Sequence, residues 1–450
     1  MHNFEFAHDL DIPVHPISAL DFMPRAELAA MQLHRLKATV RLCYERVPLT
    51  RRRMDERGVK PEHIKTLADI RLLPFMKKTD LRDEYPLGLN AADMSEVVRF
   101  HCSSGTTGKP IVITNTANDI EVWRNGAMRA LAMFGLRAHD VMQVSYGYGL
   151  FTGGLGAHYA GEGLGCAVLP TSGGNTERQL MLMRDLGVTA IACTPSYFLH
   201  LIDEGLKAGM DFRRDTKLKH GIFGAEPWTQ EMREKIEDLT GIEAHDIYGL
   251  TEISGPGVAG DCQYRCGLHV FEDHFYPEII DPETLEPLPD GEEGELVFTT
   301  LDRTGTPMLR YRTRDISRIV PDVCKCGRTM RRIARVSARS DDMLIIRGVN
   351  VFPSQIESGL LTVDKVLPHY QIVVDKAGDL DTLEVKVEVS EKTLSDDVKS
   401  LEALRKRIGA AIQHIININA RITLAEPNTL PRSEGKINRV MDLRKKRAAK

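Results

Sequence analysis

Cysteine is scarce in this chain, with 8 residues among 450, and this excludes a small scaffold held together by disulfides. No run of about 18 uncharged apolar residues occurs, so no membrane-spanning helix is predicted. The first residues, MHNFEFAHDLDIP, carry Glu5, Asp9 and Asp11 and lack the apolar stretch of a secretory signal. Together these absences predict a cytoplasmic protein with reduced thiols.

An excess of positive charge is also missing. The 59 Lys and Arg residues are outnumbered by 63 Asp and Glu residues, which gives a net charge of −4 and argues against a nucleic-acid partner. The basic ending RKKRAAK (Arg444–Lys450) is interpreted as a loose terminus rather than a nucleic-acid-binding arm. Apolar residues make up 42% and charged residues 27%, as in ordinary globular proteins, and the length suffices for two or three domains.

The residue patterns divide the chain into parts. Residues 1–90 are charged and helix-like, and within them Leu28–Val47 has apolar positions three and four residues apart. From about 95 to 250, short apolar runs alternate with helical patterns, which predicts an α/β fold with a mostly parallel sheet covered by helices. The runs interpreted as strands are 97–102, 140–147, 165–170, 188–194, 220–225 and 244–249.

The remainder of the chain differs in pattern. Residues 255–340 are rich in turns and predict a β-rich subdomain. A boundary near residue 340 would separate a large domain, 1–340, from a small α+β domain, 341–450, with the order β-β-α-β.

The stretch SSGTTGKP (Ser103–Pro110) is a glycine- and hydroxyl-rich turn after an apolar run. It is not a Walker-type phosphate loop, because Ser103 stands where the first glycine belongs and Pro110 follows the lysine. Backbone N–H groups at glycines and hydroxyl donors still suit a phosphate. Taken alone, the stretch leaves two interpretations open, a nucleotide phosphate site and a surface turn.

Further motifs decide between them. YGLTE (Tyr248–Glu252) follows an apolar run, RYRTRD ends at Asp315, SDDMLIIRGVNVFPSQIE begins at Ser340, and PRSEGKINRV ends at Val440. In this order they resemble the core motifs of the adenylate-forming superfamily. YGYGLFTGGLGAHY, LPTSGGNTERQ, TPSYFLHL and FGAEPW narrow the resemblance, over about residues 95–440, to the phenylacetate–coenzyme A ligase family.

The resemblance implies an ATP-dependent aryl acid–CoA ligase that forms an aryl-adenylate, uses Mg²⁺, and has a homodimeric state by analogy with the family. An adenylating enzyme with another acceptor, a carrier-protein thiol or a cofactor hydroxyl, is the alternative. A third interpretation, a nucleotide-binding protein without activity, is disfavoured because the motifs are complete. Whether the acid is benzoate, phenylacetate, a hydroxy or amino derivative or indoleacetate stays open, since one methylene changes binding by only about 1–3 kcal/mol.

The resemblance also assigns roles to residues. Thr251 would contact the α-phosphate, Glu252 would hold magnesium, and Asp315 would accept the ribose hydroxyls. The residues expected to hold the β- and γ-phosphates are Ser103, Ser104, Gly105, Thr106, Thr107, Gly108 and Lys109. Those expected around the adenosine are Gly224, Ala225, Glu226, Pro227, Asp246, Tyr248, Gly249 and Arg339.

Lys436 is the residue expected to carry the first half-reaction, its ammonium reaching between the carboxylate and the α-phosphate. Without the resemblance it would be interpreted as a surface lysine in a basic tail. The small domain of the family rotates between half-reactions, which implies a hinge at Asp341 and a thiol channel lined by Arg347 and Gly348.

Aromatic residues and glycines at the end of the second predicted strand and directly after it are the candidates for the acid pocket, although each aromatic ring could equally belong to the core. They are Tyr146, Tyr148, Gly149, Phe151 and Gly154, with Ala225 beneath them.

Soft ligands gather in two short, turn-rich segments, DCQYRCGLH and VCKCGRT. They predict a structural zinc bound by Cys262, His269, Cys324 and Cys326, with Cys266 able to substitute for one of these. The alternative is a set of independent reduced thiols. Four protein ligands would leave no open position for catalysis, so the metal would staple the β-rich subdomain.

Overall fold

The chain forms two compact units in a computed structural model. The first comprises Met1–Cys193, Arg213–Ala225 and Ile242–Arg335, and the second comprises Thr194–Phe212, Glu226–Gly241 and Val336–Lys450. The structure describes residues 14–103, 110–150, 152–340, 344–347, 349–377, 380–394, 398–430 and 439–444. The last and longest segment of the second unit begins at Val336, close to the predicted boundary at 340. The unit also includes two earlier segments, so that boundary stays a prediction.

Helices fill the N-terminal part of the first unit, as the sequence pattern predicts. On α1 the residues Leu28, Leu36, Val40 and Cys43 are fully buried, which confirms the amphipathic pattern of that segment. The helices are η1 (Pro16–Phe22), α1 (Arg25–Arg46), α2 (Pro48–Glu56), η2 (Pro61–His63), η3 (Leu67–Leu72) and α3 (Lys78–Asp83). Among the described residues, none of the helices combines the length and the apolar character needed to cross a bilayer.

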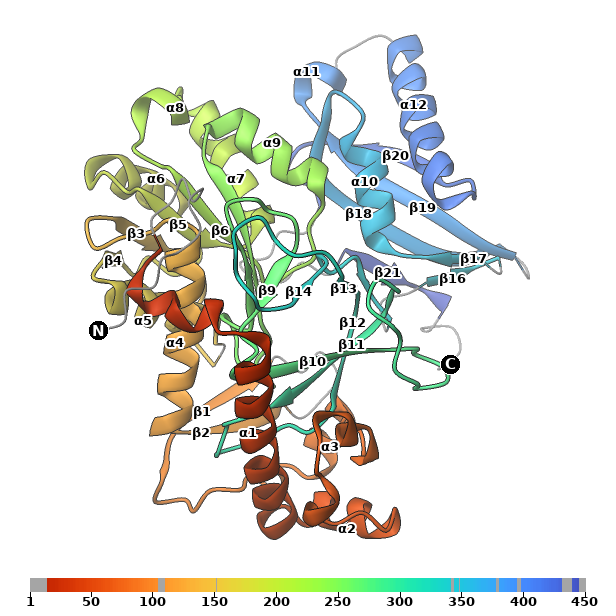
Figure 1. Cartoon of the computed structure of the whole chain (residues 1–450). Coiled ribbons are helices and arrows are strands. Elements are labelled where there is room, and N and C mark those ends of the chain that lie inside the picture. The colour runs from red at the N-terminus through yellow and green to blue at the C-terminus, as the bar shows by residue number, and fades with distance from the viewer. Residues whose placement is uncertain are drawn as a thin grey trace. The chain divides into compact units, whose positions relative to one another are not determined.

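A nine-stranded sheet is the centre of the first unit (Figure 1). Five neighbouring strands, in the order β4-β3-β5-β6-β7, are parallel, and four more strands, β8, β9, β14 and β13, continue the sheet in antiparallel pairs. The parallel strands are β3 (Val141–Val144), β4 (Ala167–Leu169), β5 (Ala190–Cys193), β6 (His220–Phe223) and β7 (Glu243–Tyr248). The others are β8 (Ala259–Asp261), β9 (Leu268–Val270), β13 (Ile319–Val320) and β14 (Arg332–Ile333).

The middle of the parallel part is buried on both faces. Every residue of β5, with the sequence AIAC, is buried, as expected for a strand covered on both sides. The helices of this part are α4 (Ala117–Met133), α5 (Gly153–Leu164) and α6 (Thr176–Asp185). The predicted alternation of strands and helices is therefore confirmed between β3 and β7.

One predicted strand belongs elsewhere. The segment 97–102 was expected to join the parallel sheet, but β1 (Val97–Ser103) pairs antiparallel with β2 (Ile111–Thr116) in a sheet of its own. The expectation was wrong because an apolar run shows neither the partner nor the direction of a strand. The hairpin brackets the glycine-rich stretch, of which 104–109 lie outside the described residues.

The turn-rich segment forms strands, as predicted. β10 (Phe275–Ile280), β11 (Gly294–Thr300) and β12 (Tyr311–Ser317) pair antiparallel in that order. All seven residues of β11 are buried.

The second unit contains the predicted β-β-α-β set, and the sheet that this set forms has one further strand, β21. The long strands β18 (Val366–Ala377) and β19 (Leu380–Val389) pair antiparallel, and β20 (Arg421–Ala425) and β21 (Val440–Asp442) each add in parallel on opposite sides. Helices α10 (Pro353–Leu361) and α12 (Val398–Ile416) lie side by side against this sheet (Figure 1). The unit also contains α7 (Pro195–Lys207), α9 (Gln230–Thr240), β15 (Ala338–Arg339), β16 (Leu344–Ile346), β17 (Val349–Val351) and α11 (Glu391–Leu394). The short α8 (Phe212–Asp215) begins with the last residue of the segment 194–212.

A fully buried arginine ties three distant segments of the first unit together. Arg129 on α4 donates from Nε to Asp21 Oδ1 at 2.9 Å and from one terminal nitrogen to both carboxylate oxygens of Asp273, at 2.9 and 3.0 Å. Asp21 also accepts from Arg328 Nε at 3.0 Å. Because all these groups are buried, each charge depends on its partners for solvation.

Replacing this arginine tests that dependence. Arg129→Ala leaves two carboxylates buried without their shared cation, so the free energy of unfolding should fall by about 3–5 kcal/mol. Chemical denaturation measures this change. The matched control is Arg124→Ala on the same helix, where an exposed ion pair with Glu121 at 3.5 Å is worth less than about 1 kcal/mol. Equal losses in the two variants would contradict the assignment.

Candidate functional site

The predicted site residues of the first unit gather at one edge of the parallel strands. Strands β3, β6 and β7 run in the same direction within one sheet, so the segments that follow them leave from the same edge. Tyr146 and Tyr148 follow β3, Gly224 follows β6, and Thr251 and Glu252 follow β7. Ligands of open α/β sheets bind at this carboxyl edge.

Two predicted nucleotide residues touch one another. The Tyr248 hydroxyl, at the end of β7, donates to Asp315 Oδ2 on β12 at 2.6 Å. The Tyr248 ring lies 6.0 Å from the Phe298 ring at a tilt of 31°. Asp315 is fixed a second time, because its backbone N–H donates to Thr313 Oγ1 at 3.0 Å. A hydroxyl, an aromatic face and a carboxylate are thus held together by strands of two sheets.

Backbone contacts explain the small residues beside them. A Cβ at Gly224 would lie 2.4 Å from the carbonyl oxygen of Ile247, so only glycine lets the segment after β6 approach β7 so closely. The next residue, Ala225, has φ of 67°, in the left-handed region that side chains rarely adopt. Strain of this kind concentrates at ligand-binding sites.

The other predicted residues of this group have structural contacts as well. The Glu226 carboxylate accepts from the Ser196 N–H at the start of α7, at 2.9 Å. Asp246 Oδ2 lies 3.4 Å from Arg335 Nε. A Cβ at Gly249 would lie 2.7 Å from the Ser254 carbonyl oxygen, so this position has no room for a side chain.

Glu252, the predicted magnesium ligand, is buried and forms an ion pair. Its Oε1 lies 3.2 Å from Lys78 Nζ on α3. A carboxylate oxygen is the kind of hard ligand that magnesium prefers. Lys78 was missed by sequence reasoning, because nothing in the pattern of residues 1–90 points to a site 170 residues further along.

A small pocket opens beside Thr251. Arg303 at its wall is buried and donates to Asn115 Oδ1 at 2.7 Å and to the Glu252 carbonyl oxygen at 3.3 Å. His101 also lines it, with Nδ1 3.2 Å from the Leu150 carbonyl oxygen and no hydrogen-bond partner for its buried Nε2. Sequence reasoning missed both residues, although His101 stands only two positions before Ser103.

Ser103 is the member of the predicted phosphate loop that the structure describes. It ends β1, and its buried hydroxyl has no hydrogen-bond partner. An unsatisfied buried hydroxyl costs free energy unless a ligand or water pairs with it. This observation agrees with a polar ligand next to β1, while Ser104, Gly105, Thr106, Thr107, Gly108 and Lys109 lie outside the described residues.

The acid-pocket candidates are only partly gathered. Tyr146 and Tyr148 are half-buried against the core, and Tyr148 Oη lies 3.2 Å from His158 Nδ1. Burial raises the pKa of the Tyr148 hydroxyl, so the phenol is neutral. A Cβ at Gly154 would lie 2.6 Å from the Gly147 carbonyl oxygen, whereas Gly149 has open space around it. Phe151 lies outside the described residues, and the role of this group stays a prediction.

In the second unit, the predicted residues are less completely described. Arg347 has φ of 52° and donates from Nε to the Asp381 carbonyl oxygen at 2.8 Å. Arg339 ends β15. Asp341, Gly348 and Lys436 lie outside the described residues, so their roles stay predictions.

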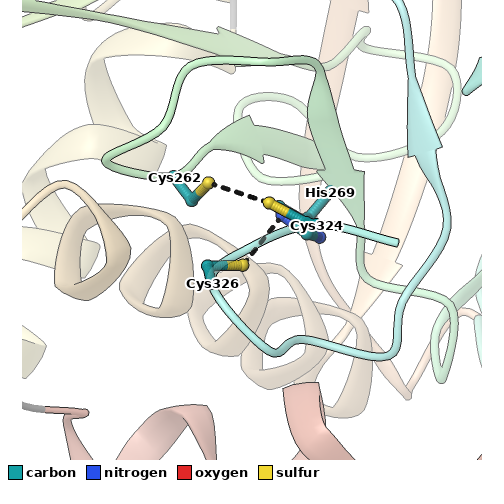
Figure 2. A group of neighbouring side chains, drawn as sticks. All are labelled: Cys262, His269, Cys324 and Cys326. Atoms are coloured by element: carbon teal, nitrogen blue, oxygen red, sulfur yellow. Dashed lines mark hydrogen bonds between the residues drawn. The ribbon is translucent and has the colours of Figure 1, made fainter. Parts of the chain in front are cut away.

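The four predicted zinc ligands come together in the first unit. Figure 2 shows Cys262, His269, Cys324 and Cys326 converging from the β8–β9 segment and from the turn between β13 and β14. All four are buried, and one ligand atom of each lies within 4.8 Å of the others. Cys266, the predicted substitute, is exposed, and its sulfur lies 3.7 Å from that of Cys324.

The geometry of this cluster fits a tetrahedral metal. Zinc–sulfur bonds of about 2.3 Å place two thiolate sulfurs about 3.8 Å apart, and Cys262 Sγ lies 3.6 Å from Cys324 Sγ. Cys326 Sγ lies 3.3 Å from His269 Nε2. The other ring nitrogen of His269 lies 3.3 Å from the Met330 carbonyl oxygen, the kind of second contact that orients a metal-binding imidazole. Hydrogen bonding with the thiol of Cys262, and to a smaller extent with that of Cys324, lowers the pKa of the Cys326 thiol.

Comparisons with known proteins agree with this arrangement. A family model described as AMP-binding enzyme matches residues 17–301, and one described as AMP-binding enzyme C-terminal domain matches residues 348–444. A solved 2-hydroxyisobutyryl-CoA ligase in complex with 2-HIB-AMP superposes with a TM-score of 0.89 at 28% identity, covering 95% of this chain and 92% of that one. Fold and matches define an adenylate-forming enzyme of the α/β class.

Closer relatives identify the family. The chain is 49% identical to the phenylacetate-coenzyme A ligase of Thermus thermophilus, covering 95% of this chain and 99% of that protein. It is 49% identical to the enzyme of that name from Escherichia coli, covering 93% and 95%. The chain belongs to the phenylacetate–coenzyme A ligase family. The predicted family, fold class and ligase class are thereby confirmed.

The pocket histidine gives the free energy of unfolding a predictable pH dependence. Burial, aided by the charges of Arg99 and Arg303, lowers the pKa of His101 from its ordinary 6.5, while the hydrogen bond to Leu150 opposes this. The unfolded chain therefore binds a proton that the folded protein resists. The stability that His101 contributes is present above about pH 6.5 and is lost as the pH falls through the lowered pKa.

Comparison of the wild type with His101→Gln isolates this effect, since all other groups titrate in both proteins. Between pH 6.5 and 5 the wild type should lose up to about 1.4 kcal/mol more per pH unit than the variant. Denaturant unfolding at several pH values measures both slopes. Parallel slopes would show that His101 titrates alike in the folded and unfolded states.

Proposed function

We propose that this chain joins a phenylacetate-like aryl acid to coenzyme A, with ATP cleaved to AMP and diphosphate and an aryl-adenylate as intermediate. The observation that carries the proposal is the 49% identity to phenylacetate–coenzyme A ligases over nearly the whole of both chains. The contact between Tyr248 and Asp315 supports it, because the two residues predicted for the adenosine lie together. A cytoplasmic location and a homodimeric state stay predictions.

The chemistry requires positive charge and oriented donors. A carboxylate is a poor acyl donor, and transfer to AMP creates a good leaving group that a thiol displaces. The anionic acid must approach a polyphosphate, so fixed donors at the α-phosphate lower the barrier most. Thr251 would supply one such donor, and Ser103–Lys109 would hold the phosphates that leave.

Glu252 would hold the magnesium ion. When bound, the ion neutralises charge on phosphate oxygens. Lys78, whose Nζ lies 3.2 Å from Oε1, holds the carboxylate in position before the substrate enters. Arg303 fixes the backbone of the same segment from its other side.

The nucleoside would lie against the edge of β6 and β7. Asp315 has two carboxylate oxygens for the two ribose hydroxyls, and Tyr248 would stack on the adenine while orienting that carboxylate. The segment Gly224–Pro227 would cover the other face of the base, Asp246 would reach its amino group, and Arg339 would lie near the ribose or phosphates.

The second half-reaction would use the small domain, 341–450. Lys436 would serve adenylation. Rotation of the small domain about a hinge at Asp341 would then bring another face of the domain to the site, where Arg347 and Gly348 would line the thiol channel. The acid itself would lie among Tyr146, Tyr148, Gly149, Phe151 and Gly154. The neutral Tyr148 phenol adds a donor there without adding charge.

The test is release of AMP and diphosphate from ATP and Mg²⁺ with benzoate, phenylacetate, hydroxy- and aminobenzoates and indoleacetate, each with and without coenzyme A. We expect CoA-dependent turnover, with phenylacetate preferred over benzoate by about 10–200-fold. Diphosphate release that coenzyme A does not stimulate would mean that the chain adenylates the acid but passes it to an acceptor other than coenzyme A. Silence with every acid would overturn the proposal.

The role of Lys436 is tested in the two half-reactions separately. Lys436→Ala should slow adenylate formation about 100- to 1,000-fold, while conversion of supplied aryl-adenylate and coenzyme A to thioester stays within a few-fold of wild type. Lys406→Ala, at an exposed position of α12, is the matched control and should change neither. Equal loss of both half-reactions in the Lys436 variant would contradict the role.

We further propose that Cys262, His269, Cys324 and Cys326 bind a structural zinc ion. Three sulfurs and one imidazole form a closed, buried ligand set, which suits a structural rather than a catalytic ion. The site would join the β8–β9 segment to the turn between β13 and β14. Arg328 lies two residues after Cys326 and forms an ion pair with Asp21. It therefore connects this turn to the network of Arg129.

Metal analysis tests this site. The purified protein should contain zinc, and Cys324→Ser should lose that zinc and more than about 4 kcal/mol of stability. Cys266→Ser, which changes a neighbouring exposed thiol, should keep both. Plasma emission spectroscopy and chemical denaturation provide the two readouts. If Cys266→Ser loses the zinc instead, Cys266 is a ligand in place of one of the four. If wild type purified from zinc-rich medium contains no zinc, the proposed site is contradicted.

A further inference from the structure

A second group of metal-binding side chains lies at the opposite, amino-terminal edge of the parallel sheet. His220 is the first residue of β6, and Glu243 and His245 are the first and third residues of β7. His220 pairs directly with Glu243 in the parallel register. Because side chains alternate along a strand, Glu243 and His245 lie on one face, and the pairing places His220 beside them.

Distances within the group approach those of a coordination sphere. Glu243 Oε2 lies 3.8 Å from His220 Nδ1 and 3.5 Å from His245 Nε2, and one ligand atom from each residue lies within 4.8 Å of the others. Tetrahedral bonds of about 2.0–2.1 Å place neighbouring ligand atoms about 3.4 Å apart. Small side-chain rotations would therefore suffice to close the group around an ion.

The buried polar atoms of this group lack protein partners. His245 is 1% exposed, and neither of its ring nitrogens has a hydrogen-bond partner among the described residues, although Nε2 lies 3.5 Å from Glu243 Oε2. Its ring is held in place by stacking on Phe134, with centroids 4.7 Å apart and planes 13° from parallel. His220 Nδ1 is also buried without a hydrogen bond. A buried imidazole with two unpaired nitrogens is costly unless something binds it.

The charge states of the group suit metal binding. Burial, and next the nearby His245, lower the pKa of His220 to about 4, so its ring is neutral at pH 7. The nearby His245 ring is the main cause that lowers the pKa of Glu243, with charges including that of Arg265 adding to it. A neutral imidazole, as at His220, and an ionised carboxylate are the forms that bind metals. Asp140 adds negative charge near His220, and Lys219 adds positive charge.

Access is open on one side. The Glu243 side chain is 56% exposed, whereas those of His220 and His245 are 14% and 1% exposed. A hydrated ion could therefore meet the carboxylate first and then exchange water for the two imidazoles. Gly135, whose φ is 102°, closes the other side, since a Cβ there would lie 3.3 Å from the His220 ring.

We propose that His220, Glu243 and His245 form a second metal site, which binds a divalent first-row transition-metal ion of the zinc type. Two imidazoles and one carboxylate match the ligand preference of Zn²⁺, Ni²⁺ and Cu²⁺ rather than that of Mg²⁺ or Ca²⁺. Three protein ligands leave a further position for water, so the ion exchanges more readily than one in the closed Cys–His site. The site shares no residue with the proposed ligase machinery.

Calorimetric titration with Zn²⁺ tests this on the full-length protein that has retained its tightly bound metal. Wild type should show a saturable binding event that His220→Gln and Glu243→Gln each weaken about tenfold or more, since even the loss of an outer-shell partner of a metal ligand costs 10- to 100-fold. His139→Gln, at an exposed histidine near Asp140, should bind like wild type. Denaturation of each variant before Zn²⁺ is added verifies that it folds.

A further variant distinguishes zinc binding at this site from zinc binding at the Cys–His site. Cys324→Ser should lose tightly bound zinc yet keep the titratable event, and thermal unfolding with added Zn²⁺ should shift upward in that variant but not in Glu243→Gln. A titration with no saturable event in wild type, or one unaffected by both His220→Gln and Glu243→Gln, would overturn the proposal. Ligase activity plays no part in either readout.

Discussion

The buried guanidinium of Arg129 is the interaction on which the first unit depends. It is shared between Asp21, before the first long helix, and Asp273, which precedes β10, so one side chain on α4 fixes segments about 250 residues apart. Apolar packing alone would let these segments slide, whereas a cation with two partners defines their positions. Since Arg328 shares Asp21, the same network also reaches the Cys–His turn. The helical N-terminal region is thereby part of the large unit and not an appendage.

Local patterns predicted a large part of this architecture. The alternation of short apolar runs with amphipathic helices is a local property, and it gave the parallel strands β3 to β7 and the helices among them. The close spacing of cysteines and a histidine in two turn-rich segments gave the four clustered ligands, because reduced thiols rarely concentrate so in one subdomain. The nucleotide residues came from the resemblance to a family and not from composition or spacing.

What could not be predicted depends on strand partners and long-range contacts. The hairpin of β1 and β2 was assigned to the wrong sheet, since direction is not encoded in an apolar run. Lys78 and Arg303 approach the site from segments without a readable motif, and His101 stands just before the glycine-rich stretch without being part of it. His220 and His245 become neighbours only through the register of β6 and β7, which no spacing in the chain reveals.

Strand β7 has a property that follows from its alternation of side chains. Glu243 and His245 point to one face of the sheet, and Asp246 and Tyr248 belong to the other set of alternating positions. A loop tolerates the insertion or deletion of one residue. In this strand the same change would exchange the two faces, and it would place the His245 imidazole on the face that Asp246 occupies. Over evolutionary time, the length of this six-residue strand should therefore be constrained more tightly than its composition.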